Sequence, residues 1–137
     1  MKTKAIHTKD QSTVETYHEY AKRLYSLHQK NLQEFYQLGN NWDGYGSPSP
    51  NPTAITGAVN LLAELYSSGF IPHFTTPTID NAVIIEVIKN GIHFRFRVID
   101  SQLVCNVRMI RGSTSKTISN DLVSFKTAVQ TAILALD

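Results

Sequence analysis

The feature that most constrains this fold is a set of three short segments in which apolar and polar side chains alternate. They span residues 82–89, 92–99 and 102–110. A period of two is typical of a strand with one face buried and the other in water. Asn90-Gly91 separates the first two segments, and this dipeptide is the strongest short signal for a two-residue hairpin turn. The three segments therefore predict an antiparallel β-meander.

The register of this meander can be tested against the hydrophobic pattern. A two-residue turn at Asn90-Gly91 gives three apolar pairs: Val87–Phe94, Ile85–Phe96 and Val83–Val98. A second two-residue turn, at Asp100-Ser101, gives three more: Phe96–Cys105, Phe94–Val107 and Ile92–Met109. A slip of one residue would move the apolar set of a whole strand to the opposite face. We therefore expect one face of the meander to be buried throughout.

A long helix is predicted before the meander, over residues 13–38. Apolar residues recur there at helical spacing, and Ser12 and Glu15 form a capping-box pattern at its start. Gly39 is the expected left-handed stop of this helix.

Two further helices are predicted on either side of the meander. Asn51 is a good N-cap and Pro52 suits the first helical position, so a second helix should begin there and end at Gly69. A last helix is expected to open at Ser119, with Asp121 favourably placed in its first turn.

The fold class follows from the order of these elements. A fourth strand is expected near residues 71–76, and Pro72 confines it to an edge because proline cannot donate to a strand ladder. The order is then α-α-β-β-β-β-α. We predict an α+β two-layer sandwich, in which a three- to four-stranded antiparallel β-meander packs against helices.

Length and composition bound the class of protein. The 137 residues suffice for one ordinary domain, which we expect over residues 11–137 after a flexible arm at residues 1–10. The single cysteine, Cys105, excludes an internal disulfide framework. The start of the chain lacks the apolar region of a signal peptide, and no run approaches the length of a membrane span. We therefore expect a cytoplasmic protein that does not enter the membrane.

Charge is unevenly distributed along the chain. Residues 10–86 hold eight acidic and three basic residues, whereas residues 87–126 hold seven basic and two acidic ones. A basic half is compatible with nucleic acid or with an acidic protein partner. The pattern favours a solvated sheet face that the acidic half partly neutralises.

The most unusual stretch is the Gly- and Pro-rich loop at residues 39–52, which contains the sole tryptophan. Three glycines and three prolines exclude a regular element there. Trp42 and Tyr45 need a reason to lie in such a loop, because exposed aromatic area is unfavourable in water. Either Trp42 packs back over the junction of the first two helices, or the loop is an aromatic anchor for a partner with Asp43 as its polar group.

This loop carries a resemblance to a known group of proteins. The stretch Asn41-Trp42-Asp43-Gly44-Tyr45-Gly46-Ser47, followed by prolines and a helix, resembles a family of small bacterial proteins with an Asn-Trp-Asp-Gly-Tyr-Gly-Ala-type motif. Ser47 stands where alanine is more usual. The resemblance covers roughly residues 35–110 and implies a short β-meander and an origin in mobile elements such as plasmids and phages. It implies no catalytic residue.

The solvent face of the meander is the second candidate surface. The predicted register places three rows on it: Glu86, Arg95 and Asn106; Ile88, His93 and Arg108; and Ile84, Arg97 and Val104. Arginine mixed with apolar groups is typical of protein interfaces. RNA-binding sheets usually expose aromatic side chains for base stacking, whereas Phe94 and Phe96 point to the core in this register.

Signals for catalysis, metals and cofactors are weak. The glycines of the loop lack the spacing of a phosphate-binding loop, and no serine sits in a nucleophile-elbow motif. The five histidines form no paired-histidine motif, so we expect no metal site. Cys105 is expected to be a buried apolar residue rather than a nucleophile. We expect no cofactor.

These observations favour a non-enzymatic protein-binding module, an inhibitor, immunity or antitoxin-like accessory protein of a mobile element. The candidate partner-binding residues are Trp42, Asp43, Tyr45, Arg95, Arg97, Arg108 and Arg111. A nucleic-acid-binding protein that uses residues 89–116 is the first alternative, and an enzyme centred on Asp43 and Tyr45 is the second. The sequence leaves the oligomeric state open.

Overall fold

A computed structural model describes residues 15–101, 104–122 and 124–136. It contains one five-stranded antiparallel sheet in the order β1-β2-β3-β4-β5. The strands are β1 (Ile71–Pro77), β2 (Val83–Lys89), β3 (Ile92–Val98), β4 (Cys105–Arg111) and β5 (Thr114–Leu122). The helices are α1 (Tyr17–Glu34), α2 (Pro52–Ser67) and α3 (Phe125–Leu134), with a short 3₁₀ turn, η2 (Phe35–Gln37), after α1. The flexible arm expected at residues 1–10 lies outside the described residues.

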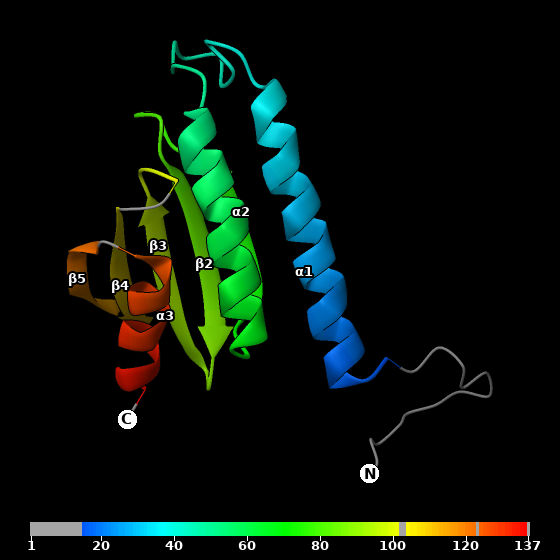
Figure 1. Ribbon diagram of the computed structural model, residues 1–137, viewed down its shortest axis with the longest axis vertical. Helices are drawn as coiled ribbons and strands as arrows, with labels where there is room; N and C mark the ends of the chain where they lie inside the picture. Colours follow the sequence, from blue (N-terminus) through cyan, green and yellow to red (C-terminus); the bar gives the residue numbers. More distant parts are fainter. Residues whose placement is uncertain (1–14, 102–103, 123, 137) are drawn as a thin grey trace.

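The α+β class is confirmed, but the sheet has five strands rather than three or four. In Figure 1, α2 and α3 lie over one face of the sheet and α1 lies beside α2. Among the described residues, no helix is both long and apolar enough to cross a bilayer.

The predicted hairpin between β2 and β3 is confirmed residue by residue. Ile85 lies opposite Phe96, with Val87–Phe94 and Val83–Val98 on either side. Asn90 and Gly91 both have positive φ, +54° and +75°. Positive φ at both central residues is what a type I′ turn requires, and this turn matches the right-handed twist of the strands.

The predicted register between β3 and β4 is wrong by two residues. Phe96 lies opposite Val107, and Val98 lies opposite Cys105. The connection closes where the Ile99 amide donates to the Val104 carbonyl at 3.1 Å, so it is longer than the two-residue turn expected at Asp100-Ser101. A shift of two residues leaves each side chain on its expected face, because the side-chain period of a strand is also two.

The N-terminal boundary of α1 also differs from the prediction. The capping box is formed by Thr16 and Glu19: the Thr16 hydroxyl accepts from the Glu19 amide, and the Glu19 carboxylate accepts from the Thr16 amide. The expected partner Ser12 lies outside the described residues. Gly39 is not left-handed; η2 ends instead at Leu38, whose backbone is extended.

The second helix follows the prediction closely. The Asn51 side chain accepts a hydrogen bond from the Thr53 amide at 3.0 Å, and Pro52 is the first helical residue. Gly69 follows the helix with φ +88°.

The last helix begins later than predicted, because a fifth strand precedes it. Ser119 and Asp121 belong to β5, and α3 starts at Phe125 with the Ser124 hydroxyl accepting from the Thr127 amide at 3.1 Å. Gly112 has φ +62° in the turn that joins β4 to β5. A glycine at the first central position is typical of a two-residue hairpin turn, and this signal indicates the fifth strand.

The core lies between the helices and the inner face of the sheet. It contains Leu32 of α1, the apolar stripe of α2, three residues of α3 and the inward residues of β2, β3 and β4. Phe70 and Phe94 meet edge to face with ring centroids 5.7 Å apart. Cys105 is fully buried as predicted, and burial raises the pKa of its thiol to about 11. A thiol with that pKa is a poor nucleophile at neutral pH.

Candidate functional site: the outer face of the sheet and the motif loop

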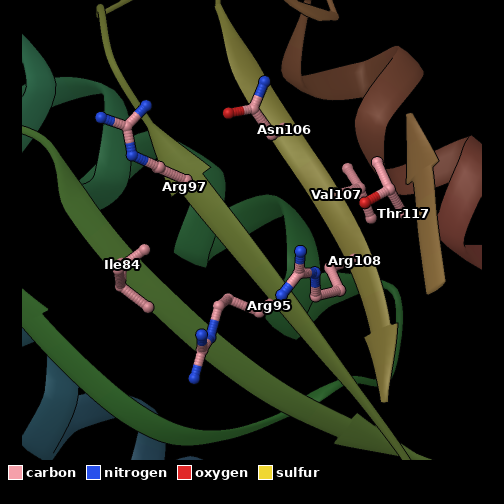
Figure 2. Close-up of a pocket in the computed structure, with 7 residues that line it drawn as sticks. All are labelled: Ile84, Arg95, Arg97, Asn106, Val107, Arg108 and Thr117. Atoms are coloured by element: carbon pink, nitrogen blue, oxygen red, sulfur yellow. The ribbon is translucent and has the colours of Figure 1, made fainter. Parts of the chain in front are cut away.

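The outer face of the sheet, which points away from the helices, carries the main candidate site. A shallow groove of about 260 Å³ runs over its centre. We call it the arginine groove; it is lined by Ile84, Arg95, Arg97, Asn106, Val107, Arg108 and Thr117. Figure 2 shows the Arg95 side chain on β3 beside that of Arg108 on β4, while the guanidinium group of Arg97 on β3 points away from them. The sheet thus presents three cations among aliphatic and small polar groups.

The corrected register explains why the arginines gather. Arg108 lies directly opposite Arg95, which in turn lies opposite Glu86. Asn106 lies opposite Arg97, which lies opposite Ile84. The predicted register placed Arg108 one row away, beside His93. The two-residue offset therefore concentrates the positive charge at the centre of the face.

Two of the three groove arginines are paired with carboxylates. Arg95 donates from Nε to Oε2 of Glu86 at 2.8 Å, and its Nη2 forms an ion pair with the same oxygen at 2.7 Å. Arg97 forms an ion pair with Asp80, which precedes β2. A hydrogen bond from the Thr78 hydroxyl, and then the charge of Arg97, hold the pKa of Asp80 below its usual range. Within the described part of the chain, Arg108 forms no ion pair.

Arg111, also predicted as a site residue, lies outside the arginine groove. It is the last residue of β4 and is exposed. Together with Met109, Thr114, Ser115 and Lys116 it lines a separate hollow at the β4–β5 hairpin. The structure therefore divides the four predicted arginines into a central group of three and one at the hairpin.

The motif loop, residues 40–50, is held together by its own polar side chains. Asp43 Oδ1 accepts from the amides of Tyr45 and Ser47 at 3.0 and 3.3 Å, and Oδ2 accepts from the Ser47 hydroxyl at 2.5 Å. Asn41 Oδ1 accepts from the Gly46 amide at 2.6 Å. The hydrogen bonds that Asp43 accepts, first that of the Ser47 hydroxyl and then that of the Tyr45 amide, lower its pKa. The polar residues of the motif thus fix the loop's conformation.

The two aromatic residues of the loop have different environments. Trp42 is half-buried and donates from Nε1 to the Pro48 carbonyl at 2.9 Å. Tyr45 is 90% exposed, and Ile79 of the β1–β2 connection is 74% exposed. Both residues line a shallow hollow with Asp43, Ser47 and Pro48. Tyr45 is therefore the aromatic group that the loop offers to solvent.

The motif loop and the arginine groove are linked through the β1–β2 connection. Ile79 lines the hollow of the loop, and the next residue, Asp80, pairs with Arg97 of the groove. The Asn51 amide also donates to the Asn81 carbonyl at 3.1 Å. The sequence-predicted residues thus form two adjoining surfaces, one around Tyr45 and one around Arg95, Arg97 and Arg108.

Sequence reasoning missed a group of possible metal ligands on the same face. His73, Glu86 and His93 come from three strands, and their ligand atoms all lie within 4.8 Å of one another. No short motif contains them, because they are brought together by strand pairing. The predicted β2–β3 register already placed Glu86 and His93 at diagonal positions, which is a signal that could have been used.

The groove lining offers groups for hydrogen bonding and ion pairing. It consists of guanidinium, amide, hydroxyl and aliphatic groups, and arginine stays protonated at all relevant pH values, so it does not serve as a general base. Comparisons of the chain with protein-family models, with curated proteins and with solved structures find no match.

Proposed function

We propose that this protein is a non-enzymatic protein-binding module whose arginine groove binds an acidic segment of a partner protein. The observation that carries the proposal is the groove on a sheet face that the helices leave uncovered. Guanidinium groups bind carboxylates with two parallel hydrogen bonds, so Arg108 is suited to an aspartate or glutamate of the partner. Ile84, which is partly exposed and lies opposite Arg97, supplies apolar contact.

The pairing within the groove favours a protein partner over nucleic acid. Glu86 and Asp80 already neutralise Arg95 and Arg97, which reduces the attraction for a polyanion. The groove lining contains no aromatic side chain on which a base could stack. A mixed surface of paired charges and aliphatic groups is typical of protein interfaces.

The motif loop extends this surface. Tyr45 and Ile79 are exposed side chains that line one hollow, and Ile79 directly precedes Asp80, the ion-pair partner of Arg97. Tyrosine is enriched at interface centres because one side chain supplies both apolar area and a hydrogen-bonding group. On the resemblance of this loop to mobile-element proteins, we propose an inhibitor, immunity or antitoxin-like role.

The proposal is tested by reversing one charge in the groove. Protein carrying Arg108→Glu is compared with wild type and with Lys126→Glu, an equally exposed cation on α3, in nuclease-treated captures from the source cell. The proposal is supported if one partner protein is captured by wild type and by Lys126→Glu but not by Arg108→Glu. Equal retention by all three proteins refutes the groove as the binding surface.

Nucleic-acid binding by residues 89–116 is the second candidate. It is favoured by Arg108, Arg111 and Lys116, which form no ion pair within the described residues and lie on neighbouring strands. It predicts that duplex DNA binds with an affinity that falls with salt at a logarithmic slope of about −0.9 per phosphate contact. Fluorescence anisotropy with a labelled duplex tests this, and the absence of binding at low salt excludes it.

A further inference from the structure

The cluster of His73, Glu86 and His93 has the composition of a metal site. Each side chain offers one ligand atom, and the three atoms lie within 4.8 Å of one another on the outer face. The two imidazole rings meet edge to face with centroids 5.2 Å apart. We propose that these three residues bind one divalent transition-metal ion, and that Zn²⁺ fits them best.

The fold brings the three residues together through a β-bulge. The pairing of β1 with β2 passes from Pro72–Val87 directly to Phe74–Glu86, so His73 is an extra residue in β1. A bulge of this kind redirects a side chain, and such bulges are frequent beside functional sites. Here Pro72 is buried while His73 and Phe74 are both exposed. The bulge therefore turns His73 toward Glu86 and His93.

Arg95, which pairs with Glu86, contacts only one of its two carboxylate oxygens, so the other is available to bind the metal. Both contacts from Arg95 fall on Oε2, at 2.8 and 2.7 Å. Oε1 can then act as ligand while Arg95 orients the carboxylate, which is the usual arrangement of groups around a metal's direct ligands. Arg95 thus serves the groove and the cluster at once.

The distances require only small side-chain movements. Tetrahedral Zn²⁺ binds nitrogen and oxygen at about 2.0–2.2 Å, which places its ligands about 3.4 Å apart. Side-chain rotation on the exposed face therefore has to close at most about 1.4 Å from the present separation. The ligand types favour a transition metal such as Zn²⁺, because imidazole suits it whereas Mg²⁺ and Ca²⁺ prefer oxygen ligands.

Three protein ligands leave one position of a tetrahedral ion open. A side chain of a partner or a water molecule can fill it. The ion would also join β1, an edge strand with a bulge, to β2 and β3. Because it binds the folded chain at residues from three strands, it should raise the melting temperature.

Isothermal titration of untagged protein with ZnCl₂ tests the site directly. We expect one Zn²⁺ per chain, and affinity at least about tenfold weaker in His73→Ala and in His93→Ala. His18→Ala is the matched control, because His18 is an exposed histidine on α1 that is not part of the cluster. We expect it to bind Zn²⁺ like wild type. The Co²⁺ complex should show visible absorption bands that both cluster variants lose.

Circular dichroism and melting curves without metal establish that the variants are folded. Because His73 is exposed on an edge strand, the fold should tolerate its replacement. Absence of saturable Zn²⁺ binding up to about 1 mM overturns the proposal. Unchanged binding in both cluster variants overturns it equally. His73 and His93 do not line the arginine groove, so this result and that of Arg108→Glu can differ.

Discussion

At the scale of single residues, the motif loop separates an aromatic group that packs from one that is exposed. Trp42 is half-buried and its indole N–H is bonded to the Pro48 carbonyl. Tyr45 is almost fully exposed. Of the two interpretations drawn from the sequence, the bond from Trp42 to Pro48 favours a structural role for Trp42 within the loop, and exposure leaves Tyr45 available as an anchor.

Replacement of these two residues should affect stability differently. Trp42→Phe removes the bond to the Pro48 carbonyl and should lower the free energy of unfolding by about 1 kcal/mol. Tyr45→Ala removes a side chain without buried contacts and should change it by less than about 0.5 kcal/mol. Urea unfolding followed by circular dichroism measures both. A larger loss for Tyr45→Ala than for Trp42→Phe would contradict this account of the loop.

Ionisation of Asp43 should make the free energy of unfolding depend on pH. Its hydrogen bonds lower its pKa in the folded protein, so the ionised group stabilises the fold above the unfolded value of about 4. That contribution is lost as pH falls through the lowered pKa. We expect wild type to be more stable than Asp43→Asn at neutral pH, and the difference to shrink in acid. Urea titrations across this range check the prediction, and a difference independent of pH would show that the Asp43 charge is unimportant.

At the scale of elements, the packing of α2 against the β3–β4 connection depends on Gly57. A Cβ atom at this position would lie 2.5 Å from the Asp100 carbonyl oxygen and 2.8 Å from the Ser101 Cα. Phe125, the first residue of α3, is equally close, with Cζ at 2.9 Å. Backbone atoms cannot move aside as a flexible side chain can, so Gly57 sets how closely three segments approach.

Gly57→Ala should therefore lower the free energy of unfolding by about 1–3 kcal/mol through overpacking. Gly39→Ala is the control, because nothing lies within 4 Å of its Cβ position and its φ is not left-handed. We expect Gly39→Ala to be neutral or to stabilise by up to about 1 kcal/mol. Thermal unfolding of both variants measures the contrast, and equal stability would mean that α2 is not closely packed at Gly57.

The elements that sequence reasoning predicted well have strong local signals. Asn90-Gly91 determines the β2–β3 register, and Asn51-Pro52 determines the start of α2. The predicted β3–β4 register is wrong because it assumed a two-residue turn at Asp100-Ser101, whereas the connection closes between Ile99 and Val104. The fifth strand was missed because the last helix was predicted to open at Ser119, which lies inside β5. The turn before this strand is marked only by Gly112.

At the scale of the whole molecule, the two faces of the sheet have different roles. The inner face and the helices bury the core, while the outer face carries the arginine groove. The acidic half of the chain supplies the partners of two basic residues, Glu86 for Arg95 and Asp80 for Arg97. The face is therefore partly neutralised, as one interpretation of the charge distribution predicted.

The sequence placed Arg95, Arg97 and Arg108 on one face of the sheet. This placement holds because a register shift of two residues leaves each side chain on the same face. It could not foresee that Arg108 lies opposite Arg95, since this depends on the corrected register. The contribution of His73 to the metal-ligand cluster was also beyond reach, because a β-bulge leaves no sequence signal of its own.

The central claim is that a partner covers the outer face, and arginine footprinting of the purified complex tests it most directly. Phenylglyoxal modification, read by mass spectrometry, compares each arginine in the free protein and in the nuclease-treated complex. We predict that Arg108 and Arg97 become protected, while Arg23, an exposed arginine on α1, reacts equally in both. If Arg108 reacts as fast in the complex as in the free protein, the partner binds elsewhere and the claim is wrong.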